Sequence, residues 1–300
     1  AHYLSIKKVV FLDINNPVKI IEHYNPKCII ISKAFSIKVA KLAEIAKDKG
    51  IKVISIFDDW IFENKNRTKI NLPLALSSDY IITKTANAAD EVYKNTKLSS
   101  VIIPDPIRFK SHTIFKKISQ PIEACWFGMH SNHNTIINEL NNLDKINLKI
   151  NLSIISNTHE KFYEFCNINI FKNIKVKFIT WNEKSNNDII KSDVVLLPYS
   201  NDKKRLVKSS NRIVEALNLG RFTILSNAIH FEEFKNYTYF GNLSDGLSWV
   251  LEEYESARKI TNDGQKYVLE NYSLNKICEK WINLFEKIDF IKILLTEFLN

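Results

Sequence analysis

Basic side chains gather in one short stretch of the chain, where they suit the binding of an anion. They are Lys203, Lys204, Arg205 and Lys208. Ser209 or Ser210 follows at once, and either can cap the helix that the next residues predict. The start of a helix presents unpaired amides and the positive end of the helix dipole. This arrangement predicts a phosphate-binding site.

The elements around this stretch are predicted to be strand, loop, helix, turn and strand. Residues 194–197 form a continuous apolar run, typical of a strand buried on both faces, and Pro198 ends it. Gly220 can close the helix in the left-handed conformation, and residues 222–225 begin the next strand. Ligands of α/β folds bind at the carboxyl ends of parallel strands, so these elements favour the same anion site. The apolar positions of the helix are Ile213, Val214, Ala216, Leu217 and Leu219.

The stretch from Asn211 to Phe222, NRIVEALNLGRF, resembles the donor-binding segment of GT-B nucleotide-sugar glycosyltransferases, notably family 4 and its relatives. That family has a helix of the form (K/R)-x-x-E-A-L-x-x-G-(R/K)-P after a strand ending in proline. The resemblance implies that Glu215 hydrogen-bonds the donor ribose, with Asn211 and Arg212 in the same site. The family usually has a second glutamate where this chain has Val207, and its loop is often acidic where this one is basic. A nucleotide-sugar site is therefore expected, without the standard catalytic geometry of family 4.

A second candidate loop, WFGMHSNHN at residues 126–134, follows the first predicted strand of the second half. In the resembling family a glycine here lets the backbone approach the donor pyrophosphate, and Gly128 matches it. The family's Arg and Lys are replaced by His130, Asn132 and His133, which as hydrogen-bond donors are candidate phosphate contacts. The alternative is a solvated loop with incidental histidines, and the sequence leaves both open.

Two adjacent carboxylates follow the predicted strand at residues 52–57. Asp58 and Asp59 lie at the carboxyl end of this strand, where a general base for an acceptor hydroxyl would be needed. An aspartate there can equally cap the next helix, and Asp13 is a weaker competitor for the catalytic role. Adjacent side chains on an extended chain point apart, which disfavours a metal site. The resemblance likewise implies cations and a helix dipole in place of a metal, so no metal or cofactor is expected.

Strand-like and helix-like patterns alternate along both halves of the chain, which predicts an α/β protein. The expected fold is two Rossmann-like domains whose parallel sheets face a cleft, the GT-B architecture. SSDYIITKTANAADEVY and VIIPDPIRF also resemble the end of a GT-B N-terminal domain. We expect an acceptor-side domain at 1–112, a linker near 110–121, a donor domain at 120–275 and a C-terminal helix at 276–300 that packs on the first domain. The expected strands are 8–12, 28–31, 52–57, 80–83, 101–103, 124–127, 151–155, 176–179, 194–197, 222–225 and 237–240.

Composition indicates a globular protein of a reducing compartment. The four cysteines are scattered, which argues against zinc or a disulfide framework, and no apolar run is long enough to span a membrane. No secretory signal is visible, and the start at Ala1 suggests trimming or processing. The net charge of +9 suits phosphates or an anionic membrane face, although the chain is rich in Lys, Asn and Ile throughout. No nucleic-acid-binding motif accompanies the charge, so nucleic acid is not expected as a partner.

These features predict a cytoplasmic glycosyltransferase, able to associate with the inner membrane face, that uses a nucleotide-sugar to build a surface polysaccharide, lipopolysaccharide or similar glycan on a glycan or lipid-linked acceptor. The basic side chains and Arg212 would stabilise charge on the leaving phosphate. Two alternatives stay open at this point. One is an enzyme like a UDP-sugar 2-epimerase, and the other is a GT-B module that binds a nucleotide or glycan without turnover.

Overall fold

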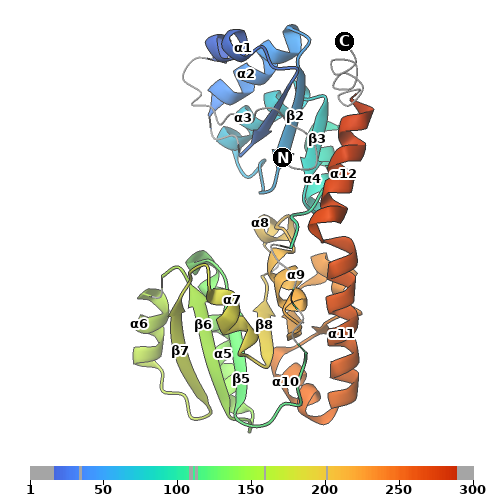
Figure 1. Cartoon of the computed structure of the whole chain (residues 1–300). Coiled ribbons are helices and arrows are strands. Elements are labelled where there is room, and N and C mark those ends of the chain that lie inside the picture. Colours follow the sequence, from blue (N-terminus) through green and yellow to red (C-terminus); the bar gives the residue numbers. More distant parts are fainter. Residues whose placement is uncertain are drawn as a thin grey trace. The chain divides into compact units, whose positions relative to one another are not determined.

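The computed structural model describes residues 17–33, 36–107, 111, 114–158, 160–200 and 202–288. They form two compact units, each built on its own parallel sheet (Figure 1). The four-stranded unit comprises the chain up to Pro106, the segment Asp202–Ser209 and the helix that begins at Leu274. The six-stranded unit comprises Ile107–Asn201 and Ser210–Ser273. The expected strand at 8–12, the candidate Asp13 and the apolar tail at 290–299 lie outside the described residues.

The four-stranded unit has the strand order β1-β2-β3-β4, all parallel, as its alternating pattern predicted. Its second helix begins after Ser36, and Gly50 with φ +73° follows its end. The strands are β1 (Cys28–Ser32), β2 (Lys52–Phe57), β3 (Tyr80–Thr83) and β4 (Val101–Ile102). The helices are α1 (Pro17–Tyr24), α2 (Ile37–Asp48), α3 (Lys65–Leu76), α4 (Ala86–Thr96), the short α8 (Lys203–Leu206) and α12 (Leu274–Lys287).

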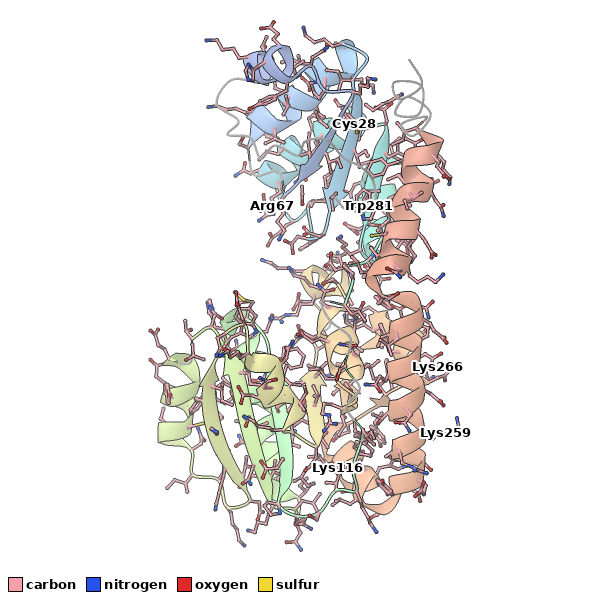
Figure 2. All side chains as sticks on the ribbon, in the orientation of Figure 1. Cys28, Arg67, Lys116, Lys259, Lys266 and Trp281 are labelled. Carbon is pink, nitrogen blue, oxygen red and sulfur yellow. The ribbon has the colours of Figure 1, made fainter. Side chains whose placement is uncertain are left out.

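The C-terminal helix α12 packs on the four-stranded sheet, which accounts for its inclusion in that unit. Its apolar positions, among them Ile277 and Leu284, form one buried cluster with Ile54 and Ile82 of the sheet. Trp281 lies against the same cluster, and Figure 2 labels it on α12. Full burial of each such side chain contributes roughly 1.5–3 kcal/mol, so burial of this apolar face stabilises the docked helix.

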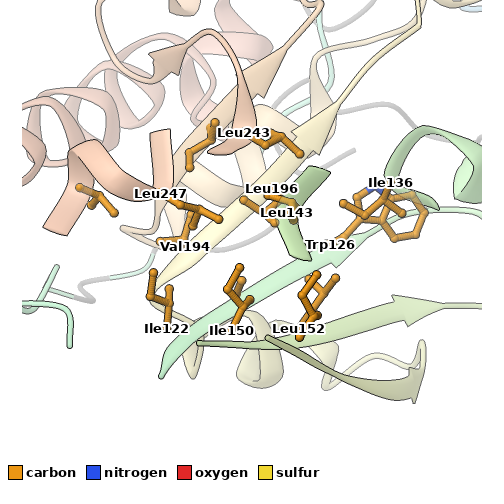
Figure 3. Close-up of a cluster of buried hydrophobic side chains, with 14 of the residues drawn as sticks. Ile122, Trp126, Ile136, Leu143, Ile150, Leu152, Val194, Leu196, Leu243 and Leu247 are labelled. Carbon is orange, nitrogen blue, oxygen red and sulfur yellow. The ribbon is translucent and has the colours of Figure 1, made fainter. Parts of the chain in front are cut away.

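The six-stranded unit has the order β10-β9-β8-β5-β6-β7, again with parallel pairs throughout. Figure 3 shows its core, in which large aliphatic side chains from β5, β6 and β8 meet those of the covering helices. The strands are β5 (Ile122–Phe127), β6 (Ile150–Ser156), β7 (Ile174–Thr180), β8 (Val194–Pro198), β9 (Phe222–Ser226) and β10 (Tyr239–Phe240). The helices are η1 (His130–Asn132), α5 (His133–Lys145), α6 (Glu160–Ile168), α7 (Ser185–Ile190), α9 (Asn211–Asn218), η2 (Ile229–Phe234), α10 (Leu243–Glu252) and α11 (Tyr254–Asn271).

The segment β8–α9–β9 has the elements that its sequence predicted. All residues of β8 are buried and the strand ends at Pro198, since proline cannot donate to the ladder. Ser210 stands at the N-cap position of α9, although its side chain makes no capping hydrogen bond there, and Gly220 has φ +63° after the end of the helix. Both ends of the predicted helix are therefore found where the sequence placed them.

Arg221, the basic residue of the Gly-Arg pair after α9, has a structural role. Its side chain is buried, and its guanidinium donates to the carbonyl oxygens of Leu219, Ile190, Ser192 and Ile114 at 2.9–3.1 Å. Burial lowers the pKa of Arg221. The bond to Ile114 fixes part of the segment expected to be a linker onto the six-stranded unit.

In the part of the chain that the structure describes, the helices are too short or too polar to cross a bilayer.

Candidate functional site

The candidate site lies at the carboxyl edge of the six-stranded sheet, where β5 and β8 end. Arg212, from the first turn of α9, places its guanidinium carbon 4.9 Å from the ring centre of Tyr199 and 5.9 Å from the ring of Trp126. It donates to the carbonyl oxygen of Phe127 at 3.4 Å. Stacking on aromatic faces suits arginine because its guanidinium is planar and weakly hydrated. The guanidinium is thereby held beside the loop that follows β5.

Gly128 makes room for this arrangement. A Cβ atom built on Gly128 would lie 3.3 Å from Nη1 of Arg212 and 3.3 Å from the ring of Trp126, tighter than ordinary contact. The glycine that the sequence singled out for a close backbone approach to a ligand thus also admits the arginine from α9. These two predicted site residues, from distant parts of the sequence, are brought together.

Tyr199 is a site residue that the sequence analysis missed. It follows β8 directly, is buried, and its ring lies against the Arg212 guanidinium. Burial raises the pKa of Tyr199, and the nearby Arg212 opposes that shift. Its edge also meets the ring of His230, with ring centres 5.4 Å apart. An aromatic residue directly after a buried strand that ends in proline was the available signal.

His130 is oriented by Asn157, a second residue that the sequence analysis missed. The side-chain oxygen of Asn157 accepts from the backbone amide of His130 at 2.9 Å, which leaves its amide nitrogen to donate to Nδ1 of the ring, also at 2.9 Å. With Nδ1 accepting, neutral His130 carries its proton on Nε2. Asn157 follows β6, the neighbour of β5, and this adjacency could be read only from strand order.

The other histidine of this loop points inward. His133 is buried between the rings of Trp126 and Phe162, with ring centres 5.4 and 5.2 Å away. The expectation that it contacts phosphate is therefore wrong, because it opens α5 with its side chain in the core. Asn132 stands at the N-cap position of α5 and makes no side-chain capping bond there.

Glu215 lies one helical turn after Arg212 on α9. Residues three apart share a helix face, so the carboxylate and the guanidinium project from the same side. Glu215 is half-buried, while Asn211 opens the helix and is exposed. The predicted residues of α9 therefore lie on one helix, with Asn211 and Arg212 at its start and Glu215 one turn later.

The basic segment ahead of α9 belongs to the four-stranded unit. Lys204 pairs with Glu63 at 3.0 Å, Lys208 pairs with Asp59, and the side chain of Asn87 donates to the Leu206 carbonyl at 3.3 Å. The sequence predicted these cations as partners of a ligand, and in the structure they have carboxylate partners within this unit.

The remaining residues of the segment differ in their contacts and in their exposure to solvent. Arg205 pairs with Asp202 at 3.0 Å, whose side chain also caps α8. Lys203 is exposed and Ser209 is partly exposed. Val207, at the position where the resembling family has a glutamate, is buried and anchors the segment.

Asp58 and Asp59 follow β2 as expected, and each has a basic partner. Asp58 lies 3.6 Å from the ammonium of Lys33, and Asp59 pairs with Lys208. Neither caps the next helix, because the side chain of Asn64 does so by accepting from the amide of Arg67 at 3.0 Å. The capping alternative is therefore wrong. Within the described ranges, no group of three or more His, Cys, Asp or Glu side chains could hold a metal ion.

Two α/β units, each on its own parallel sheet, are the architecture of the GT-B fold, and solved structures of that fold are similar to this chain. The solved structures that are similar to this chain share little sequence identity with it, so the similarity establishes the fold alone. No protein-family model matches the chain, and no curated protein sequence is significantly similar to it.

Three of these structures illustrate the similarities. The lipopolysaccharide outer core galactosyltransferase WaaB is 13% identical with a TM-score of 0.63, over 91% of this chain and 79% of that one. HepE from Anabaena, solved with UDP and glucose, is 13% identical with a TM-score of 0.69, over 90% of this chain and 81% of that one. A UDP-GlcNAc 2-epimerase from Neisseria meningitidis, bound to UDP-GlcNAc, is 10% identical with a TM-score of 0.52, over 91% of this chain and 80% of that one.

Proposed function

We propose that this protein is a glycosyltransferase that moves a sugar from a nucleotide-sugar donor to a glycan or lipid-linked acceptor. The observation that carries the proposal is the Arg212 guanidinium, stacked on Tyr199 and Trp126 beside Gly128 at the carboxyl edge of a parallel sheet. A fixed cation next to a close-approach glycine, at the start of a helix, suits a diphosphate.

The donor is held by the six-stranded unit. Arg212 and the Nε2–H of His130 contact the phosphates, and Glu215 accepts from the ribose hydroxyls. Asn132 and Asn211 lie at the starts of α5 and α9 and complete the polar surroundings. The solved relatives that carry UDP or a UDP-sugar support UDP as the first nucleotide to test.

The chemistry follows from where charge develops. Breaking the bond between sugar and phosphate leaves negative charge on the leaving oxygen, and donors already in position stabilise that charge without reorganising. Arg212 has this role. In the four-stranded unit Asp59 is the proposed base that takes the proton of the acceptor hydroxyl, with Asp58 as the second candidate. No metal or cofactor enters this mechanism.

The acceptor is proposed to belong to a cell-surface polysaccharide or lipopolysaccharide. The name of WaaB, a lipopolysaccharide galactosyltransferase, supports this class. The net charge of +9 supports association with an anionic lipid surface that carries such an acceptor, on the cytoplasmic face of the membrane.

Two observations each favour a function other than glycosyl transfer. The similarity to a UDP-GlcNAc 2-epimerase favours an enzyme that converts the sugar while it is attached to the nucleotide. The ion pair between Asp59 and Lys208 favours a module that binds the donor without turnover, because the candidate base already has a cationic partner.

One experiment separates these functions. The protein is screened by thermal shift against UDP, GDP, CMP and their sugars, and the nucleotide-sugars that bind are incubated with glycan or lipid-linked acceptors. Release of the nucleotide with a glycosylated acceptor supports the transferase. Conversion to a second nucleotide-sugar supports the epimerase, and binding without either product supports the module. The absence of any shift with all nucleotides and nucleotide-sugars would contradict the donor site itself.

A further inference from the structure

A short segment of the six-stranded unit exposes two isoleucines to solvent. It comprises residues 168–173, which we call the isoleucine loop, and it joins the end of α6 to β7, the edge strand of the sheet (Figure 1). Ile168 is 82% exposed and Ile170 is 98% exposed. Single exposed apolar residues are common on protein surfaces, but two of them on one short loop form a small apolar surface.

The isoleucine loop is held in place by its other residues. The backbone amides of Lys172 and Asn173 donate to the carboxylate of Asp144 at 3.1 and 2.7 Å. The Asn173 side chain donates to the carbonyl of Asp144 at 2.9 Å. Phe171 packs against the core, with its ring centre 6.2 Å from that of Phe165. The two isoleucines are therefore exposed on a backbone that is hydrogen-bonded to the end of α5 and anchored by an aromatic ring.

Lysines surround the two isoleucines. Lys149, from the loop before β6, places its ammonium 2.8 Å from the side-chain oxygen of Asn173 and 3.4 Å from the carbonyl of Lys172. The exposed lysines at the amino ends of β6 and β7 are Lys145, Lys149, Lys172 and Lys175. Asp144 and Glu123 also lie at this edge, but both accept hydrogen bonds, from backbone amides and from a side-chain amide of β6. The surface around the isoleucines is therefore positive.

An anionic bilayer suits this surface better than a protein partner does. Protein interfaces are depleted of lysine, and a stable one buries about 800 Å² on each partner. A fluid bilayer needs no complementary shape, because it takes up exposed apolar side chains while its anionic headgroups attract the lysines beside them. Two exposed isoleucines on one loop with four lysines around them match the second case.

We propose that the isoleucine loop and its lysines dock the protein on bilayers that contain anionic lipids. Ile168 and Ile170 enter the headgroup region, and the lysines contact lipid phosphates. This inference deepens the membrane association in the proposed function and rests on that part of it. The loop lies at the amino edge of the sheet and the donor site at the carboxyl edge, so lipid binding and donor binding are separate measurements.

The test is sedimentation of the full chain, without nucleotide, with vesicles of phosphatidylcholine alone or mixed with phosphatidylglycerol in equal parts. The wild type should bind the mixed vesicles at least about tenfold more tightly, and added salt should weaken this binding. Ile168→Ser with Ile170→Ser should weaken it about tenfold or more, because two inserted apolar side chains are lost. Lys149→Gln with Lys172→Gln should weaken it about 10- to 30-fold, since each lysine at an anionic surface contributes about fivefold.

Matched controls come from the same unit. Ile229→Ser removes an isoleucine of η2 that is 66% exposed. Lys259→Gln with Lys266→Gln removes two exposed lysines of α11, both labelled in Figure 2. Each control should bind the mixed vesicles within about threefold of wild type, because distant charges are screened. Thermal unfolding confirms that every variant is folded.

Ile170→Trp tests insertion into lipid directly. Tryptophan is favoured at the interface between membrane and water, so this variant should bind the mixed vesicles at least as tightly as wild type. A contact shaped for isoleucine would instead be weakened by the larger ring. Weaker binding of Ile170→Trp would therefore overturn the insertion of this side chain.

The outcomes distinguish this inference from the donor site. If the wild type does not bind the mixed vesicles, or if the loop variants bind them as tightly as the controls do, the inference fails whatever nucleotides the protein binds. If the loop variants lose vesicle binding and the wild type binds no nucleotide, the inference holds and the proposed donor site fails.

Discussion

The cations on either side of Ser210 lie in very different surroundings, although they are close in sequence. Lys204 and Lys208 pair with the carboxylates of Glu63 and Asp59 in the four-stranded unit. Arg212 instead lies against two aromatic rings and a backbone carbonyl in the six-stranded unit. A run of basic residues can therefore contain ion-pair partners and a candidate ligand contact, and only their neighbours distinguish them.

The largest effect is expected from a change at Asp59, the ion-pair partner of Lys208. If Asp59 is the base, Asp59→Asn should lower the rate of sugar transfer by about 10²–10⁴-fold, the usual contribution of a positioned general base. Nucleotide affinity should stay unchanged, because this carboxylate belongs to the other unit. Transfer rates and calorimetric titration of the same variant separate the two effects.

The control for this change is Asp48→Asn, at an exposed position near the end of α2, which should transfer at the wild-type rate. A loss in Asp58→Asn with none in Asp59→Asn would move the base to Asp58.

The two kinds of cation can be compared directly by removing one of each. Arg212→Ala should weaken nucleotide binding about 10- to 100-fold, because a hydrogen bond to a charged group contributes roughly 1.5–3 kcal/mol. Lys208→Ala should change it less than about threefold, since an exposed ion pair contributes little. Titration with the same nucleotide measures both.

Arg258→Ala is the matched arginine control. Arg258 lies on α11 and pairs with Glu255 at an exposed position, so its removal should leave the affinity unchanged. Equal losses in Lys208→Ala and Arg212→Ala would mean that both cations bind the donor, against the distinction drawn here.

A smaller effect is expected at the pair that orients His130. His130→Ala should weaken nucleotide binding about fivefold, the factor that corresponds to one net hydrogen bond. Asn157→Ala should weaken it less, and should add nothing in the His130→Ala background, because Asn157 acts through the ring it orients. Additive losses in the double variant would show that Asn157 has a separate role.

A further effect concerns the pH dependence of stability and the ring of His230 beside Tyr199. Burial lowers the pKa of His230 from 6.5 to about 4, so the folded chain keeps it neutral where the unfolded chain protonates it. The contribution of His230 to the free energy of unfolding is fully present above pH 6.5 and is lost as the pH falls from 6.5 toward 4. With allowance for its partial exposure, the loss is about 1–2 kcal/mol.

Thermal unfolding between pH 7 and pH 4.5 measures this loss. His230→Phe should flatten the dependence between pH 6.5 and 4.5. An unchanged slope in that variant would show that His230 does not titrate in this range.

Local patterns alone determined much of this protein. Apolar runs, and the proline, serine and glycine residues that bound them, predicted the strands from Cys28 onward, the helix after Ser210 and the turn at Gly220. These elements depend on backbone preferences and on the burial of continuous apolar segments, which are local properties of the sequence. They also predicted the two parallel sheets, since alternation of strand and helix leaves few other folds. The position of Gly128 beside the end of β5 came from the same reasoning.

Only the tertiary structure decided which side chains meet. Strand order brings Asn157 to His130, and packing sets Arg212 against Tyr199 and turns His133 into the core. Spacing along the chain carries no information about such pairs, because their members come from different strands and helices. For the same reason, spacing could not show that Lys204 and Lys208, which were predicted to bind an anion, have carboxylate partners. Those partners, Glu63 and Asp59, are far away in sequence.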